Sequence, residues 1–162
     1  GEVMGIGDDF GAAFAKAQLA AGNKLPLAGR VFISVRDEDK AEIVQVAKDL
    51  MDAGFDIIAT SGTARYLKGR GIVVEGVYKV NEGRPNVVDR IKSREVDMVI
   101  NTSFGAKSVA DSYSIRRSSL EFGLPYFTTV AGAKAAALGI KALLKNELDV
   151  KTIQEYHKQL NA

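Results

Sequence analysis

The chain has 162 residues, of which 46% are hydrophobic and 26% charged, so it is long enough to form one domain with a buried core. Its net charge of +2 is spread along the sequence without basic runs, which argues against a nucleic-acid partner. The sequence has no cysteine, no apolar run long enough to span a membrane and no signal-peptide pattern. These absences exclude disulfides and thiolate chemistry, and we expect a soluble, cytoplasmic chain without a membrane partner.

The first 29 residues differ in pattern from the rest of the chain. A narrow apolar stripe predicts a helix that starts near Phe10 and ends at Gly22. Residues 22–29 carry two glycines and a proline without periodicity, which is typical of a linker. We therefore predict two parts: residues 1–27, an amino-terminal helix and linker that belong to a preceding domain, and residues 28–162, the main domain.

Beyond this segment, short apolar runs alternate with segments of helical periodicity. Buried strands that alternate with helices imply a parallel sheet with helices on both faces. Because crossovers are right-handed, the pattern favours a three-layer α/β/α domain with a five-stranded, doubly wound, flavodoxin-like sheet. The expected strands are residues 31–35, 57–59, 72–77, 98–100 and 126–127, and the expected helices are residues 43–51, 64–69, 86–94, 111–122, 130–144 and 151–160.

Polar side chains follow every expected strand. Ligands of doubly wound sheets bind beyond the carboxyl ends of the strands, so we expect these side chains to gather on one rim. Hydroxyl groups, helix amino termini and lysine ammonium groups can hold a phosphate without a metal, and an asparagine amide can recognise a sugar or base. The sequence thus favours an anion site made from Ser34, Lys40, Thr60, Ser61, Thr63, Lys79, Asn101, Thr102, Ser103, Thr128 and Thr129.

The alternative is that these hydroxyl groups are helix caps, each serving its own helix. Ser61 directly follows an apolar run and precedes a helical segment, where serine usually satisfies free backbone N–H groups. Asp37 and Asp39 are likewise expected to cap the helix that follows them. Caps alone do not require Lys40 and Lys79, which is why we favour the anion site.

Residues for catalysis are largely missing from this rim. His157 is the one histidine of the chain and belongs to the last expected helix, so there is no Ser-His-Asp set and no histidine pair for a metal. No Walker or GxGxxG loop occurs. A phosphate cradle without an acid-base pair binds its ligand without turning it over, so we expect a binding module without a cofactor of its own.

Residues 30–144 contain the motifs FISVRDEDK, GFDIIATSGTARYL, KVNEGRP, DMVINTSFG, DSYSIRRSSLEFGLPYFTT and AGAKAAALGI. These motifs resemble the methylglyoxal-synthase-like domain, and in particular the carboxyl-terminal regulatory domain of carbamoyl phosphate synthetase large chains. The opening stretch GEVMGIGDDFGAAFAKAQLAAG resembles the end of the synthetase domain that precedes it. The resemblance implies that the chain is a fragment of a larger subunit.

The resemblance also implies an allosteric role. Bacterial members of this family bind UMP as an inhibitor and IMP as an activator at one overlapping site. By position, Lys40, Thr60 and Thr63 would hold the phosphate, and Lys79 and Asn101 would lie nearer the ribose or base. Further matches to effector contacts are Ser34, Thr102, Ser103 and Thr129, and Thr128 matches a position that contacts ornithine.

The larger protein that the resemblance implies is a glutamine-hydrolysing ligase that makes carbamoyl phosphate for arginine and pyrimidine synthesis. It uses ATP, Mg²⁺ or Mn²⁺ and K⁺, and its partner is a glutaminase small subunit. The alternative is a related enzyme that acts on a phosphorylated small molecule, either methylglyoxal synthase or the cyclohydrolase that closes the ring of IMP. The Gly-Pro-x-Gly-Gly-Asp loop and catalytic histidine of the first, and the GRVKTLHPK signature of the second, have no counterpart in this sequence.

Overall fold

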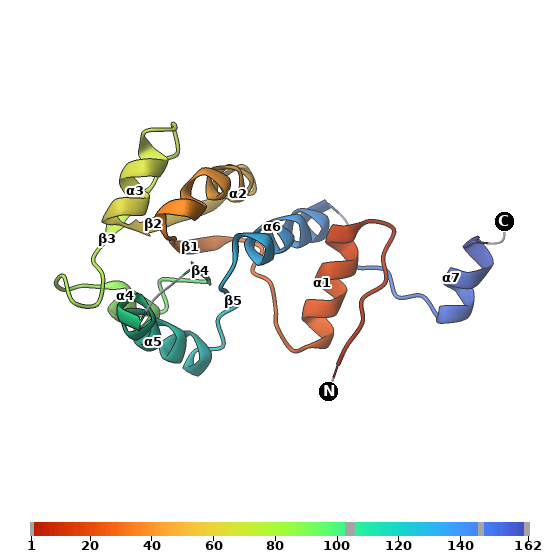
Figure 1. Ribbon diagram of the computed structural model, residues 1–162. Helices are drawn as coiled ribbons and strands as arrows, with labels where there is room; N and C mark the ends of the chain where they lie inside the picture. Colours follow the sequence, from red (N-terminus) through yellow and green to blue (C-terminus); the bar gives the residue numbers. More distant parts are fainter. Residues whose placement is uncertain (1, 103–105, 146–147, 161–162) are drawn as a thin grey trace.

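The computed structural model describes residues 2–102, 106–145 and 148–160. Within these ranges, one sheet of five parallel strands has the order β3-β2-β1-β4-β5 (Figure 1). The strands are β1 (Gly29–Ser34), β2 (Phe55–Thr60), β3 (Glu75–Val77), β4 (Met98–Asn101) and β5 (Tyr126–Phe127). The chain runs outward from β1 to β3 and then crosses to β4 on the other side of β1. This arrangement confirms the predicted doubly wound parallel sheet.

The helices follow the strands in the predicted alternation. They are α1 (Phe10–Ala20), α2 (Lys40–Asp52), α3 (Ser61–Lys68), α4 (Val87–Lys92), α5 (Ala106–Glu121), α6 (Val130–Lys145) and α7 (Ile153–Leu160), and a short 3₁₀ turn (Asp37–Asp39) leads into α2. α5 starts at Ala106 rather than at residue 111, because alanine and lysine extend a helix without adding to its apolar stripe. β3 is shorter than expected, since Ile72 and Val74 are buried before the residues that pair with β2.

Side chains along the central strands β1, β2 and β4 alternate between two cores. In β1, Val31 and Ile33 pack with residues of α2, α3 and α6, whereas Phe32 packs on the opposite face with residues of α4 and α5. The strands are therefore buried on both faces, which explains their continuous apolar runs in the sequence. Helices cover both sides of the sheet, and the predicted three-layer α/β/α architecture is confirmed.

The amino-terminal segment packs against the rest of the chain through α6. α1 lies beside α6 (Figure 1), and Ala15 and Leu25 are buried in the same core as the sheet. A Cβ atom on Gly139 would lie 2.9 Å from Leu25 Cδ1 and 3.3 Å from Phe14 Cδ1, so glycine permits the close approach of α6. The predicted linker thus contributes Leu25 to the core, while the assignment of residues 1–27 to a preceding domain stays a prediction.

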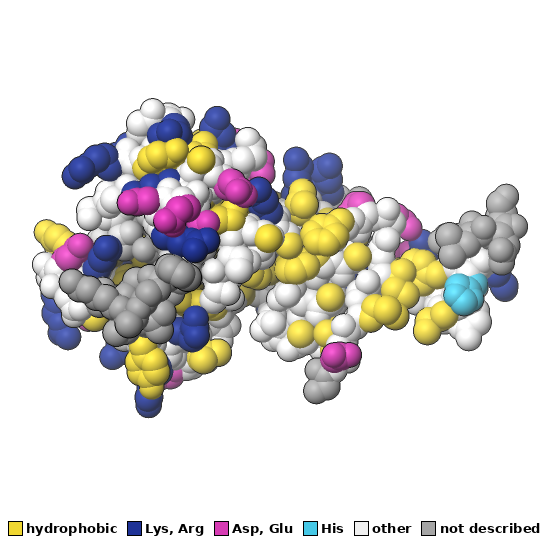
Figure 2. All heavy atoms as spheres, viewed as in Figure 1, with side chains coloured by type: hydrophobic (Ala, Val, Ile, Leu, Met, Phe, Trp, Pro, Cys, Tyr) yellow, Lys and Arg dark blue, Asp and Glu magenta, His cyan; other side chains and the backbone are white. Residues whose placement is uncertain are grey.

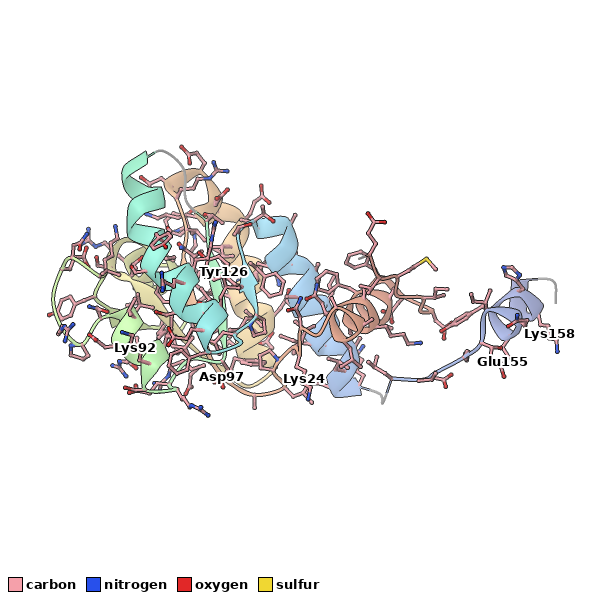
Figure 3. The ribbon with its side chains drawn as sticks, turned by 90° about the horizontal axis from the view of Figure 1, so that it is seen from below. Lys24, Lys92, Asp97, Tyr126, Glu155 and Lys158 are labelled. Atoms are coloured by element: carbon pink, nitrogen blue, oxygen red, sulfur yellow. The ribbon has the colours of Figure 1, made fainter. Side chains whose placement is uncertain are left out.

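α7 stands apart from the sheet, with Glu155 and Lys158 at the outer end of the molecule (Figure 3). Tyr156 connects this helix to the amino-terminal segment. Its hydroxyl accepts a hydrogen bond from Lys16 Nζ at 2.9 Å and donates one to the carbonyl oxygen of Ile6 at 3.1 Å. The first and last helices, α1 and α7, therefore lie at the same end of the molecule.

The start of β1 depends on Gly29. This residue has φ +111°, and a Cβ atom there would collide with the carboxylate of Asp97, which accepts a hydrogen bond from the Arg30 backbone N–H at 2.7 Å. We predict that Gly29→Ala lowers the free energy of unfolding by about 1–2 kcal/mol more than Gly22→Ala does, as measured by urea denaturation. Gly22 also has a positive φ, of +81°, but a Cβ atom there would meet nothing within 4 Å. Equal losses for the two variants would contradict the collision.

Candidate functional site

A polar pocket of about 400 Å³ lies at the carboxyl ends of β1 and β2. It is lined by Ser34, Val35, Arg36, Asp37, Glu38, Lys40, Thr60, Gly62, Thr63 and Lys79. The structure therefore brings together five of the residues predicted for an anion site, which are Ser34, Lys40, Thr60, Thr63 and Lys79. Charged side chains of both signs gather over the half of the molecule that holds the sheet, whereas hydrophobic ones are prominent over the half that holds α1 (Figure 2).

The amino terminus of α3 forms one wall of this pocket. α3 begins at Ser61 directly after β2, and Thr60 occupies the N-cap position without a side-chain cap hydrogen bond. The alternative in which Ser61 caps this helix does not hold, because Ser61 is already the first helical residue. The exposed Ser61 side chain is not part of the pocket lining, whereas Gly62 is. The free N–H groups of the first turn, together with the helix dipole, suit an anion.

The pocket hydroxyl groups are tied to one another and to β1. Ser34 Oγ and Thr60 Oγ1 lie 3.0 Å apart and form a hydrogen bond. Thr63 Oγ1 accepts a hydrogen bond from the Val35 N–H at 3.2 Å and donates one to the Val35 carbonyl oxygen at 3.4 Å. Thr60 and Thr63 are both buried. These contacts fix the first turn of α3 against the end of β1. The two threonines therefore form part of the buried wall of the pocket.

Lys40 and Asp37 form an ion pair in the pocket, with 2.6 Å between Lys40 Nζ and Asp37 Oδ1. A Cβ atom on Gly62 would lie 3.5 Å from Lys40 Nζ, which places the ammonium group over the first turn of α3. The hydrogen bond from Lys40 and the positive charge of Lys40 lower the pKa of Asp37, and the charge of Lys79 lowers it further. Both lysines therefore act electrostatically on the same part of the pocket.

Asp37 and Asp39 do not cap α2, contrary to the prediction. Asp39 stands at the N-cap position, but its carboxylate accepts hydrogen bonds from Arg36 Nε at 2.7 Å and Arg36 Nη2 at 3.2 Å. This bidentate pair lowers the pKa of Asp39 and raises the pKa of Arg36. The 3₁₀ turn directs both carboxylates to neighbouring cations, and no N-cap side chain bonds to the first turn of α2. Sequence reasoning missed Arg36 and Glu38 as pocket residues, although the dense charge run RDEDK was a signal.

Asn101 and Thr102 lie at the same edge of the sheet but outside the pocket lining. Asn101 is the partner of Ser34 in the parallel register of β1 and β4, and its Nδ2 donates a hydrogen bond to the Tyr126 hydroxyl at 2.8 Å. Tyr126 is labelled on β5 in Figure 3. Thr102 Oγ1 accepts a hydrogen bond from the Arg36 backbone N–H at 3.2 Å. The first contact joins β4 to β5, and the second joins the residue after β4 to Arg36, two residues beyond the end of β1.

The remaining predicted residues follow β4 or β5. Thr129 Oγ1 accepts a hydrogen bond from the Gly132 N–H at 3.0 Å and so caps α6, as the cap alternative expects. Thr128 is exposed beside it, and its contact with ornithine stays a prediction. Ser103 lies outside the described residues.

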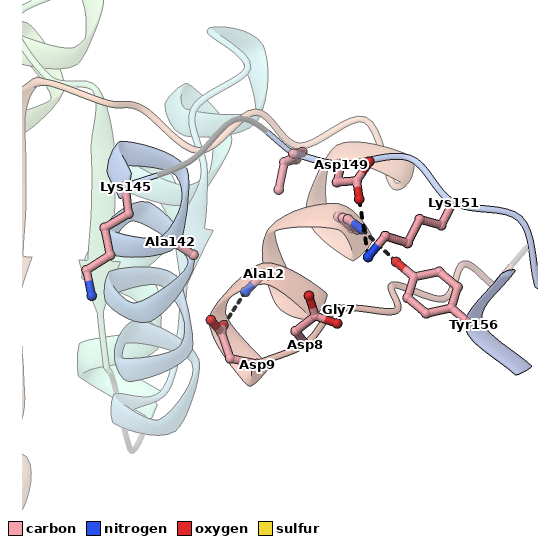
Figure 4. A pocket seen from close by; sticks show the side chains of 11 residues that line it. Gly7, Asp8, Asp9, Ala12, Ala142, Lys145, Asp149, Lys151 and Tyr156 are labelled. Carbon is pink, nitrogen blue, oxygen red and sulfur yellow. Dashed lines mark hydrogen bonds and ion pairs between the residues drawn. The ribbon is translucent and has the colours of Figure 1, made fainter. Parts of the chain in front are cut away.

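A second hollow, of about 360 Å³, lies between α1, the end of α6 and α7 (Figure 4). Several of its charged groups have partners within the protein. Lys151 Nζ lies 3.3 Å from Asp149 Oδ2, and Asp9 Oδ1 accepts a hydrogen bond from the Ala12 N–H at 2.8 Å. Lys16 bonds to Tyr156 as described above. The bond between Lys16 and Tyr156 joins α1 to α7, and both residues line this hollow.

Across residues 2–102, 106–145 and 148–160, no group of three or more histidine, cysteine, aspartate or glutamate side chains could hold a metal ion. In the same part of the chain, no helix combines the length and the apolar character needed to cross a membrane.

A doubly wound parallel sheet with a polar pocket at its carboxyl edge places the chain in the class of three-layer α/β domains. A family model described as the MGS-like domain matches residues 42–128, which is more than half of the chain. The chain belongs to the MGS-like domain family. This membership confirms the resemblance drawn from its motifs.

Two similar proteins are carbamoyl phosphate synthase large chains. The one from Myxococcus xanthus is 53% identical over 156 residues, which cover 96% of this chain and 14% of that protein. The one from Methanothrix thermoacetophila is 51% identical over 160 residues, which cover 99% of this chain and 15% of that protein. The chain is thus homologous to a small MGS-like region of these large chains and spans about 15% of their length.

A crystal structure of methylglyoxal synthase from Elizabethkingia anophelis matches with a TM-score of 0.56 and 16% sequence identity. The match covers 83% of this chain and 93% of that one, and it shows that the two share a fold.

Proposed function

We propose that this domain binds a nucleoside monophosphate of the UMP or IMP type and acts as a regulatory effector domain. The observation that carries the proposal is the pocket in which Lys40 and Lys79 accompany the uncapped first turn of α3. Backbone N–H groups, a helix dipole and two ammonium groups are the chemistry that holds a phosphate without a metal. The pocket volume of about 400 Å³ lies within the range of small-molecule sites.

The position of Lys40 supports a role beyond helix stability. Lys40 is the first residue of α2, and a positive charge at a helix amino terminus is unfavourable. Its pairing with the exposed Asp37 offsets little of this effect, because exposed ion pairs contribute little to stability. An anionic ligand explains a lysine at this place better than the fold does.

The nucleoside end of the proposed ligand is directed toward β4. Asn101 lies beside Ser34 across the β1–β4 pair, and Lys79 follows β3 on the other side of the pocket. An amide that both donates and accepts can recognise a ribose or base, so we assign Asn101 to this end, while Lys79 stays with Lys40 at the phosphate end. Thr102 and Thr129 complete the proposed set at the carboxyl edge.

Because the chain spans about 15% of its carbamoyl phosphate synthase relatives, its wider role is part of the same proposal. We propose that it regulates a cytoplasmic glutamine-hydrolysing ligase that serves arginine and pyrimidine synthesis. Such a ligase would bring ATP, Mg²⁺ or Mn²⁺, K⁺ and a glutaminase small subunit, while this domain contributes effector binding. His157 belongs to α7, which lies at the opposite end of the molecule from β1, β2 and α3 (Figure 1), the elements that contribute to the pocket, and this disfavours the alternative of a methylglyoxal synthase.

The proposal predicts that UMP or IMP stabilises the isolated chain. A ligand at ten times its Kd raises the free energy of unfolding by about 1.4 kcal/mol, which corresponds to a Tm increase of about 3–6 °C. A thermal-unfolding titration measures this increase, and uridine, which lacks the phosphate, is the matched control and should leave Tm unchanged. The absence of a shift with either nucleotide at millimolar concentration would contradict the proposal. Formation of methylglyoxal from dihydroxyacetone phosphate would favour the enzyme alternative.

A further inference from the structure

Asp37, one of the two acidic residues that line the proposed phosphate site, has no role in ligand binding in the function proposed so far. Asp37 Oδ1 lies 2.6 Å from Lys40 Nζ, and Lys40 Nζ lies over the first turn of α3. A carboxylate oxygen therefore occupies a place beside the ammonium group that a phosphate oxygen would take. A negative charge at this place also repels an anionic ligand.

We propose that Asp37 is an internal competitor for the Lys40 ammonium, and that an anionic ligand binds by displacing the Asp37 carboxylate from Lys40. This inference rests on the proposed function, since it specifies how the same site is regulated. In effect, Asp37 lowers the affinity of the pocket for phosphate and sets the effector concentration to which the domain responds.

The exposure of the two partners makes this exchange feasible. The Lys40 side chain is only 17% exposed, so its ammonium group is held close to the pocket wall. The Asp37 side chain is 91% exposed, so its carboxylate can leave Lys40 for water at little cost. The partner that stays is therefore the lysine, and the partner that moves is the aspartate.

The neighbouring carboxylates are directed to a different cation. Glu38 Oε2 lies 3.7 Å from Arg36 Nε, and Asp39 forms the bidentate pair with the same guanidinium. Among the ion pairs of the described residues, Asp37 is the carboxylate that contacts Lys40. Glu38 lines the same pocket and is 77% exposed, so it offers a matched control of the same charge.

The test is calorimetric titration of the whole 162-residue chain with inorganic phosphate and with UMP. We expect Asp37→Asn to lower Kd about three- to tenfold for both probes. Glu38→Gln removes one negative charge from the same pocket and should change Kd less than twofold. Equal tightening in both variants would reduce the effect to general electrostatics and overturn the inference. Weaker binding in Asp37→Asn would also overturn it, because Asp37 would then orient Lys40 for the ligand.

A double-mutant cycle with Lys40→Met gives an independent check. In the Lys40→Met background, Asp37→Asn should change the Kd for phosphate less than twofold, because the ammonium group for which Asp37 competes is absent and only the general charge effect remains. A three- to tenfold tightening that persists there overturns the inference. If the original chain binds UMP and only the Asp37 effect is missing, the proposed function stands without this inference. If neither the original chain nor Asp37→Asn binds phosphate or UMP at millimolar concentration, both proposals fail.

Discussion

Replacement of Phe32 by alanine is expected to lower the free energy of unfolding by about 3–5 kcal/mol. Phe32 is 0% exposed in β1, the central strand, and its register partners are Ile58 of β2 and Val99 of β4. All three face the core beneath α4 and α5. Truncation there leaves a cavity that the paired strands on either side cannot close. The variant therefore loses the transfer free energy of the buried ring and also carries the free-energy cost of the cavity.

Urea denaturation measures this loss, and Phe10→Ala is the matched control. Phe10 is 62% exposed at the start of α1, where its ring stacks on Phe14 with centroids 6.0 Å apart. The same change of side chain should therefore lower stability by less than about 1 kcal/mol. A loss at Phe32 no larger than that at Phe10 would mean that the sheet core relaxes around the missing ring.

The sheet could be predicted because its signal is local and strong. Residues such as Val31, Phe32 and Ile33 form a continuous apolar run, and such runs mark strands buried on both faces. The weaker elements lack this signal. The first turns of α5 carry no apolar stripe, and Leu25 lies in a segment with linker composition yet is buried against Gly139 of α6.

The pocket residues could be predicted as a set, whereas their contacts could not. The rule that ligands lie beyond the carboxyl ends of parallel strands brings Ser34, Thr60 and Lys79 together without any coordinates. The ion-pair partners of Asp37 and Asp39 depend on a 3₁₀ turn, and the hydrophobic periodicity of the sequence does not predict such a short turn. Likewise, Asn101 bonds to Tyr126, 25 positions along the chain, and only the tertiary structure joins them.

Replacement of Lys40 by methionine is expected to weaken UMP binding about 10- to 100-fold, which corresponds to a charge-assisted hydrogen bond of about 1.5–3 kcal/mol. Methionine keeps most of the apolar stem and removes the ammonium group over the first turn of α3. The fold should not suffer, because the variant removes a cation from the amino terminus of α2 and breaks only a pair with an exposed aspartate.

The matched control is Lys48→Met, which removes the same charge from an exposed position of the same helix and outside the pocket lining. Long-range attraction of a nucleotide is screened at physiological salt, so this variant should bind UMP within about twofold of the original chain. Calorimetric titration of both variants, with urea denaturation as a check on folding, compares the two. Equal weakening would assign the effect to net charge. A folded Lys40→Met variant with unchanged affinity would show that the phosphate does not lie beside Lys40 Nζ over the first turn of α3.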